Sequence, residues 1–343
     1  MSQKPTGRKS LSVAGRTDLV DPAEMVLQGS DGWLFLRGDG NNVIGQHTGR
    51  VTRGWRGRRR WRSLLAERTK LQDELDFVWA MEIVPDKEAV YPEFLPPSVV
   101  PAPSRPVHEI LELADGAGAP VHYLLDDLIA AKSRGELYSK TDTHWNFRGS
   151  FAAYQAICER LAGRGLDLRI LEQAEIRWET YDGHQDLGMK LSPPQLSKHV
   201  RADLIEHRSK LVFDNRIARH SRTLIFEQDA PELPSALVFG ESFAFHLLIF
   251  LKESFRRLAF VHTSSLSPEV VAAERPDVVL SVPIERFMLW PPTDRNMLQG
   301  LREMALEKAF RAEVLYTPDE FTASTPRAQQ RLDSVITATI PWS

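Results

Sequence analysis

Short apolar runs alternate with longer stretches of helical periodicity along most of this chain. The apolar run Phe77–Val84 ends at Pro85, and it follows a stretch, Trp61–Leu75, whose apolar residues recur at helical spacing. Such alternation is typical of α/β proteins, because parallel strands need a crossover connection that is usually a helix. We therefore expect an α/β fold with a largely parallel sheet flanked by helices.

The same two patterns predict the remaining elements. Strands are expected at 121–125, 223–226, 235–239, 258–261 and 277–282, and helices at 126–132, 147–161, 243–257, 268–274 and 296–310. Residues from about 167 to 220 are less regular and richer in charge, so we interpret them as an insertion or cap. The expected organisation is a flexible tail over 1–25, one domain over 26–316 and a second tail over 317–343.

Composition limits the classes of function. With 343 residues, 42% of them hydrophobic, the chain can bury a full core. The net charge of -3 argues against general nucleic-acid binding, which usually requires a basic surplus. The single cysteine, Cys158, excludes an intrachain disulfide framework and a cysteine-based zinc site. Its place in a helical pattern favours a buried, inert thiol.

The chain shows no apolar run of membrane length. Its first 21 residues are polar and lack the apolar core of a secretory signal. The most apolar stretch, Phe243–Leu251, is far too short to cross a bilayer. We therefore expect a soluble, cytoplasmic protein.

Three residues from two distant segments form a candidate catalytic site. Asp142 and His144 are two residues apart, so in an extended segment they lie on the same side and the carboxylate can orient the imidazole. Ser242 follows an apolar strand at the start of a helix, where ligands bind in open α/β sheets and backbone N–H groups are free. A serine needs a base to become a nucleophile, and His144 supported by Asp142 would be that base.

Each part of this site also has a plainer explanation. A glycine two residues before a serine, as in Gly240–Ser242, is more often a turn than a nucleophile. An Asp two residues before a His can be a helix cap beside a surface histidine. The pair can also supply two ligands of a metal site, with His184 and Asp186 as complement, although ligand spacing makes this the weaker interpretation.

Several motifs, taken in order, resemble those of a known family, the SGNH hydrolase-like domain of the alginate O-acetyltransferases and their relatives in exopolysaccharide acetylation. The resemblance rests on five segments between Gly32 and Arg286: Gly32–Leu36 with Asp39, Val84–Pro92 with Leu95–Pro96, Tyr138 with Thr141–Trp145 and Gly149, Gly240–Phe243, and Pro276–Leu280 with Glu285–Arg286. The combination is much more specific than any single motif. It implies a catalytic triad of Ser242, His144 and Asp142, in which the aspartate and histidine precede the serine.

The resemblance also implies partners, and the chain departs from the family in two respects: the residue before the serine, and the lack of the export signal expected of periplasmic members. Glu241 precedes the serine, where many family members have a smaller residue or Asp. The family acts on saccharides in the periplasm, usually beside a membrane protein that delivers the acetyl group. We therefore expect a saccharide acceptor and an acetyl donor as partners, with a membrane acyltransferase or a glycosyltransferase as a further one. We expect no cofactor, metal or nucleic acid.

Other residues have a functional and a structural interpretation of similar weight. Lys87, Tyr91, Trp145 and Arg286 are the candidate substrate-binding residues, but structural packing or ion pairing explains them equally well. His246 lies one helical turn after Ser242, and we interpret it as packing. The arginines between Arg53 and Arg62 could bind a polyanion or a membrane surface; an exposed helix start with Trp61 turned into the core is the favoured interpretation.

The sequence thus predicts serine-based acyl transfer, most simply O-acetylation of a saccharide through an acyl-enzyme. A carbohydrate esterase with the same triad is the nearest alternative, because the two activities differ only in whether sugar or water reaches the acyl-enzyme. A catalytically silent carbohydrate-binding module or complex subunit is an alternative from another class.

Overall fold

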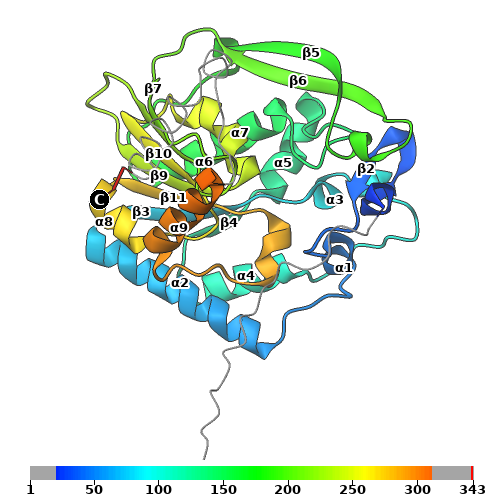
Figure 1. The fold of residues 1–343 in the computed structure, drawn as a ribbon, viewed down its shortest axis with the longest axis horizontal. Helices are drawn as coiled ribbons and strands as arrows, with labels where there is room; N and C mark the ends of the chain where they lie inside the picture. Colours follow the sequence, from blue (N-terminus) through cyan, green and yellow to red (C-terminus); the bar gives the residue numbers. More distant parts are fainter. Residues whose placement is uncertain (1–20, 311–340, 343) are drawn as a thin grey trace, which may run out of the picture.

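A seven-stranded sheet forms the centre of the molecule. The computed structural model describes residues 21–310 and 341–342 (Figure 1). The strand order is β4-β3-β11-β9-β10-β8-β7, comprising β3 (Val78–Ile83), β4 (Val121–Tyr123), β7 (Lys210–Asp214), β8 (Thr223–Glu227), β9 (Ser235–Gly240), β10 (Arg257–His262) and β11 (Val278–Val282). Neighbours from β4 to β10 pair in parallel, whereas β8 and β7 add an antiparallel edge. The predicted α/β class with a largely parallel sheet is confirmed.

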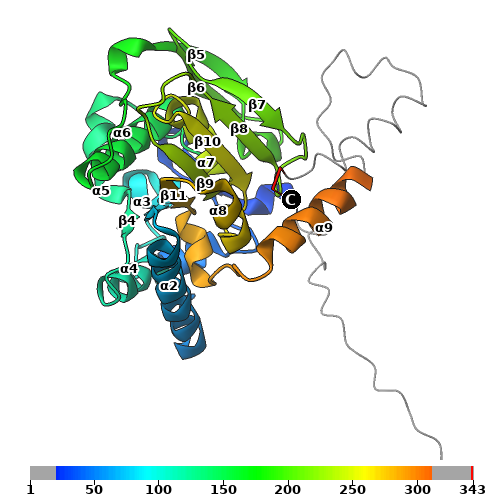
Figure 2. The same cartoon turned by 90° about the vertical axis from the view of Figure 1, so that its left-hand side faces the viewer.

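Helices cover both faces of this sheet because its central strands are apolar on both sides (Figure 2). Along β9, Leu237 and Phe239 belong to one core cluster, and Ala236 and Val238 to the other. The first cluster includes residues of α2 (Trp55–Leu75), α4 (Pro106–Asp115), α8 (Pro268–Glu274) and α9 (Met297–Phe310). The second includes residues of α3 (Lys87–Val90), α5 (Leu125–Ala131), α6 (Phe147–Gly163) and α7 (Ser242–Leu251).

Two small antiparallel sheets lie outside the central one. β1 (Val26–Gln28) pairs with β2 (Leu34–Leu36), and the short helix α1 (Val43–His47) follows them. β5 (Ile176–His184) and β6 (Leu196–Leu204) form a long hairpin that arches over the top of the view in Figure 1. The segment expected as an irregular insertion, 167–220, therefore contains two regular nine-residue strands and also β7, the edge strand of the central sheet.

The observed helices and strands differ from the predicted ones mainly at their ends. The helix expected at 243–257 ends at Leu251, because the chain turns to enter β10 at Arg257. The strand expected at 121–125 ends at Tyr123, since Leu125 begins α5. Cys158 is buried on α6, and burial raises the pKa of its thiol to about 12, as expected of an inert cysteine.

Parts of the expected organisation concern residues outside the described ones. Most of the predicted tails, 1–25 and 317–343, lie there; of the N-terminal one, the structure describes residues 21–25. Among the described residues, no helix combines the length and the apolar character that crossing a membrane requires.

Candidate active site

Ser242 lies at the junction between the central sheet and a helix. β9 ends at Gly240, Glu241 is extended, and Ser242 is the first residue of α7. The approach is close enough to require glycine at position 240, since a Cβ there would lie 2.3 Å from the Ala244 Cβ and 3.0 Å from the Val282 carbonyl oxygen. The amide of Ser242 belongs to the first turn of the helix, where N–H groups have no intrahelical partner. The junction thus presents a hydroxyl and a free amide at the carboxyl edge of the sheet.

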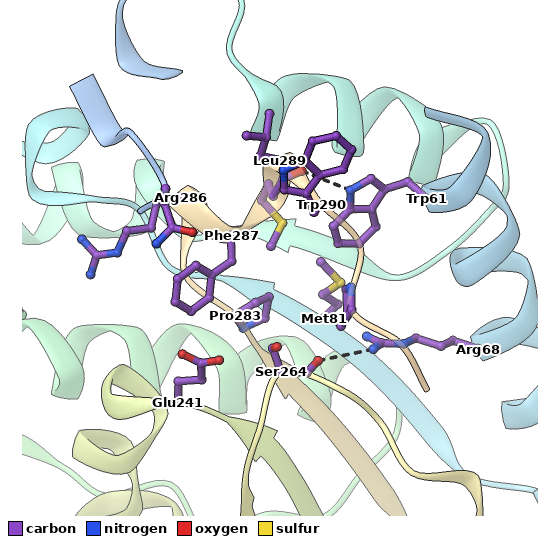
Figure 3. Close-up of a pocket in the computed structure, with 13 residues that line it drawn as sticks. Trp61, Arg68, Met81, Glu241, Ser264, Pro283, Arg286, Phe287, Leu289 and Trp290 are labelled. Carbon is purple, nitrogen blue, oxygen red and sulfur yellow. Dashed lines mark hydrogen bonds between the residues drawn. The ribbon is translucent and has the colours of Figure 1, made fainter. Parts of the chain in front are cut away.

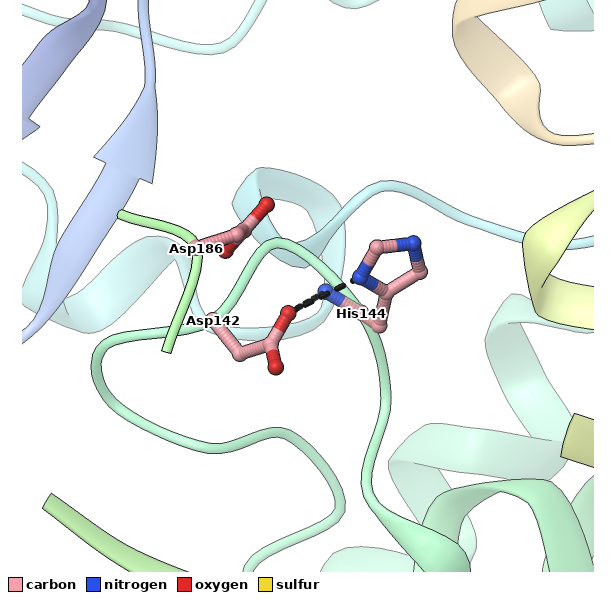
Figure 4. A group of neighbouring side chains, drawn as sticks. All are labelled: Asp142, His144 and Asp186. Atoms are coloured by element: carbon pink, nitrogen blue, oxygen red, sulfur yellow. Dashed lines mark hydrogen bonds and ion pairs between the residues drawn. The ribbon is translucent and has the colours of Figure 1, made fainter. Parts of the chain in front are cut away.

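The loop from 135 to 146 brings a histidine and an aspartate to this serine. The Nε2 of His144 is 2.8 Å from the Ser242 Oγ, and its Nδ1 is 2.9 Å from the Asp142 Oδ1. The same carboxylate oxygen accepts the backbone N–H of His144 at 2.9 Å (Figure 4). Burial alone would raise the pKa of Asp142, but the hydrogen bonds and charge of His144 outweigh it and lower that pKa to about 2. The three predicted catalytic residues are therefore within hydrogen-bonding reach of one another.

A buried lysine, Lys87, holds the 135–146 loop through its backbone carbonyl oxygens. The Nζ of Lys87 donates to the carbonyl oxygens of Ser139 and Lys140 at 3.1 Å and of Asp142 at 2.5 Å. Only 2% of its surface is exposed, and this burial lowers the pKa of its ammonium to about 8. Lys87 begins α3, four residues after β3 ends at Ile83, so the amine is positioned close to the carboxyl edge of the sheet.

The loop after β5 supplies a second carboxylate, Asp186, which the sequence suggested only as a complementary metal ligand. Asp186 accepts the backbone N–H of Thr143 at 2.8 Å and its hydroxyl at 2.5 Å. Burial, followed by the negative charge of Asp142, raises the pKa of Asp186. Both contacts fall on the residue between Asp142 and His144, so the β5–β6 hairpin holds the middle of the catalytic segment.

Asp142, His144 and Asp186 also form the cluster that a metal site would need. One donor atom from each lies within 4.8 Å of the others (Figure 4). The donors are already engaged, however, because the imidazole is bonded to Asp142 and Ser242 while Asp186 is bonded to Thr143. His184, the other ligand considered from sequence, is not part of this cluster. These bonds leave the three side chains less open to a metal ion and match the arrangement that the predicted triad requires.

The four predicted substrate-binding residues lie around the site, and all are buried. The Tyr91 hydroxyl accepts the N–H of Leu137 at 2.8 Å, which anchors the start of the catalytic loop. Trp145 packs its edge against Phe243, with ring centroids 5.5 Å apart. Arg286 pairs with Asp86 at 2.9 Å and stacks over the same phenylalanine. Together with Lys87, these residues contact the scaffold of the site, and a direct role in binding substrate stays a prediction.

Two further features considered from the sequence, His246 and the arginine cluster at 53–62, make contacts that a packing role explains. The ring of His246 lies 5.5 Å from that of His144, and burial lowers its pKa to about 4, so it is neutral beside the base. In the arginine cluster, Arg53 is buried and pairs with Glu109 at 3.0 Å. Trp61 is fully buried, as the favoured interpretation requires, whereas Trp55 is exposed on α2.

Solved structures share this fold. The O-acetyltransferase domain of Pseudomonas putida AlgJ is 20% identical, with a TM-score of 0.50 over 81% of this chain and 99% of that domain. Bacillus cereus PatB1, solved with a sulfonyl adduct, is 15% identical, with a TM-score of 0.59 over 78% of this chain and 96% of PatB1. A DHHW family protein from Eubacterium siraeum is 14% identical, with a TM-score of 0.52 over 81% and 98% of the two chains.

Comparison at the level of sequence agrees with the resemblance drawn from the motifs. No curated protein matches the chain. A family model does match, over residues 26–262, which include Asp142, His144 and Ser242. Because this match covers more than half of the chain, the protein belongs to the family of the SGNH hydrolase-like domain of the acetyltransferase AlgX.

Proposed function

We propose that this protein is a serine-dependent O-acetyltransferase that acetylates a saccharide hydroxyl through an acyl-enzyme. The observation that carries the proposal is the continuous hydrogen-bonded series from Asp142 through His144 to Ser242, with distances of 2.9 and 2.8 Å. Membership of an acetyltransferase family supports the type of group transferred. That solved structures with this fold include an O-acetyltransferase domain supports it further.

The first half-reaction loads the serine. His144 Nε2 takes the proton of the Ser242 hydroxyl as its oxygen attacks the acetyl carbonyl of the donor. The carbonyl oxygen becomes an oxyanion, which the Ser242 amide at the helix N-terminus is suited to stabilise. The leaving group then departs with the proton from His144, and the acetyl ester remains on Ser242. The Asp142 carboxylate stabilises the imidazolium that forms between these two steps.

The second half-reaction transfers the acetyl group. A saccharide hydroxyl gives its proton to His144 while its oxygen attacks the ester carbonyl, and the collapse of the oxyanion returns that proton to Ser242. The partners are thus a saccharide acceptor and an activated acetyl donor. By analogy with the family, a membrane acyltransferase or a glycosyltransferase would work beside this protein.

Two competing functions keep the same fold. An esterase uses the same triad and differs only in letting water take the acetyl group. A silent binding module needs no aligned triad, and the short contact between His144 and Ser242 weighs against it. Lys87 and Asp186 hold the catalytic loop through five hydrogen bonds, which a silent module would not need.

Intact-protein mass spectrometry tests the proposal. After exposure to an activated acetyl ester, the wild type should gain one acetyl mass, and Ser242→Ala and His144→Ala should gain none. A sulfonyl fluoride gives an independent probe of an activated serine. Discharge of the adduct faster by an oligosaccharide than by water identifies a transferase, whereas discharge by water alone identifies an esterase. A folded wild type that forms no adduct with either reagent would contradict both the transferase and the esterase.

A further inference from the structure

A hollow of about 260 Å³ lies next to the segment that carries the proposed nucleophile. One wall is Glu241, the residue directly before Ser242. Figure 3 shows its carboxylate facing the same space as Phe287, Pro283 and Ser264. Ser264 and Pro283 follow β10 and β11, so the hollow lies at the carboxyl edge of the sheet, where α/β proteins bind ligands.

The opposite walls are largely aromatic and apolar. Trp61 donates its indole N–H to the Met288 carbonyl at 3.1 Å, which fixes its ring in the wall. Trp290 also lines the hollow and keeps 62% of its surface exposed. A sugar ring has C–H faces that pack against aromatic rings and hydroxyl edges that need acceptors. Aromatic rings opposite a carboxylate offer both kinds of contact.

The charged residues around the hollow differ in whether they have an ion-pair partner. Arg68 is bound through two nitrogens to Asp294, at 2.8 and 2.9 Å, and Arg286 is paired with Asp86 at 2.9 Å. The Arg286 guanidinium also points away from the rings of Trp61 and Trp290 (Figure 3). Glu241 has no ion pair among the described residues. Each of the two cations is therefore engaged by a carboxyl group, whereas the Glu241 carboxyl faces the hollow without an ion-pair partner.

Burial reinforces this picture for Glu241. It raises the pKa of the Glu241 carboxyl to about 7, with Ser264 and the positive charge of Arg286 opposing the shift. Near neutral pH the group is divided between a carboxylate that accepts hydrogen bonds and an acid that also donates one. Either form can bind a sugar hydroxyl. Neither offers a counter-charge to an anionic ligand.

We propose that this hollow is the acceptor subsite and that it selects a sugar unit without a carboxylate. The inference rests on the proposed function, since it places the acceptor next to an acetylated Ser242. A neutral unit would stack on Trp290 and give hydroxyl hydrogen bonds to Glu241, with the hydroxyl to be acetylated directed at the ester. A uronate in the same place would bring a second negative charge against the ionised form of Glu241, and like charges in contact are strongly unfavourable.

The test measures how the acetyl-enzyme divides between sugar and water. Wild-type protein is loaded with an activated acetyl ester and mixed with a neutral gluco-oligosaccharide or with an oligogalacturonide of equal length. Discharge by water in the same sample is the internal reference, so a change in loading does not affect the ratio. The neutral sugar should discharge the adduct at least tenfold faster than the uronate does.

Three variants test whether the preference for the neutral sugar arises in this hollow. Glu241→Gln keeps the shape of the side chain and should reduce the preference for the neutral sugar to within about threefold, because the repulsion is gone. Trp290→Ala should slow discharge by the neutral sugar relative to water by about tenfold. Trp55→Ala, which removes an exposed tryptophan elsewhere on α2, should leave the ratio unchanged.

The outcomes separate the two proposals. If no adduct forms on wild type, the proposed function fails and the acceptor subsite fails with it. If the adduct forms but both sugars discharge it equally, or neither does, the subsite is wrong while the acyl-enzyme stands. A preference for the uronate, or a Trp290→Ala variant with the wild-type ratio, would also overturn the subsite. Thermal melting of each variant shows that it is folded.

Discussion

The two halves of the candidate catalytic site are held in place by different means. Ser242 is positioned by main-chain structure, because it joins a fully buried central strand to a helix. Asp142 and His144 lie in a loop whose regular pairing is limited to one isolated bridge, between Tyr138 and Trp145. Side chains from distant segments, above all Lys87 and Asp186, hold that loop. The position of Ser242, the proposed nucleophile, thus depends on packing, whereas that of His144, the proposed base, depends on a few polar contacts that can be removed singly.

The largest effect is expected from Lys87→Met. It leaves three carbonyl oxygens without their buried donor, and each unsatisfied group costs about 1–3 kcal/mol, partly offset by the relief of burying a charge. We expect a loss of about 3 kcal/mol in the free energy of unfolding and an acylation rate lower by roughly 10²-fold, because the base shifts. Denaturant unfolding and adduct-formation kinetics measure the two. Lys70→Met, on the exposed face of α2, is the control and should change neither.

Gly240→Ala tests the packing half of the comparison. A Cβ at this position would collide with Ala244 in the first turn of α7. Overpacking of this kind costs about 1–3 kcal/mol, and relief requires the helix start to move with Ser242. The melting temperature and the rate of adduct formation should therefore fall together. A variant that acylates at the wild-type rate would show that the junction is less constrained than its contacts indicate.

A smaller effect is expected from Asp186→Ala. The change removes both hydrogen bonds to Thr143 but leaves the three bonds of Lys87, so the loop keeps its main anchor. We expect roughly tenfold slower acylation and a stability loss of about 1 kcal/mol. Asp182→Ala, an exposed position on β5, is the matched control. Equal effects from the two variants would indicate that the hairpin does not position the base.

The last expected effect is a pH dependence of stability to which Glu88 contributes. Its Oε1 accepts the N–H of Leu36 at 3.1 Å, and burial raises the pKa of its carboxyl to about 7 from an ordinary 4.5. Between these values the unfolded chain has released the proton while the folded protein keeps it, so this group makes stability fall as pH rises from about 4.5 to 7. Glu88→Gln should reduce that slope when the two proteins are compared by unfolding across this range, and the part that remains includes the contribution of Glu241, whose pKa burial also raises to about 7. A wild-type slope in the variant would assign the pH dependence to other groups.

The sequence was most informative where burial dictates composition. The strands β9, β10 and β11 were predicted within one or two residues, because runs buried on both faces are nearly continuous in apolar residues. The family was likewise identified correctly from its motifs, and the matching family model confirms it. The hairpin of β5 and β6 was interpreted as irregular because most of its residues are exposed and polar, which hides strand periodicity.

Residues that act through main-chain contacts were harder to identify. The partners of Lys87 are carbonyl oxygens, which carry no signal in the identity of the residues that bear them. Asp186 entered only as a candidate metal ligand, since its contact with Thr143 joins segments 43 residues apart. The hollow beside Glu241 depends on walls from several separate segments, so it too has no sequence signature.

What the sequence determined by itself is local: alternating strands and helices, a serine at a strand-to-helix junction, and an aspartate two residues before a histidine. These follow from hydrophobic periodicity and backbone geometry, which act over a few residues. Only the tertiary structure could bring His144 to Ser242 across 98 residues of chain and place Asp186 against Thr143, the residue before His144. The physical reason is that parallel strands share one carboxyl edge, and side chains gathered there meet through packing rather than through their order in the sequence.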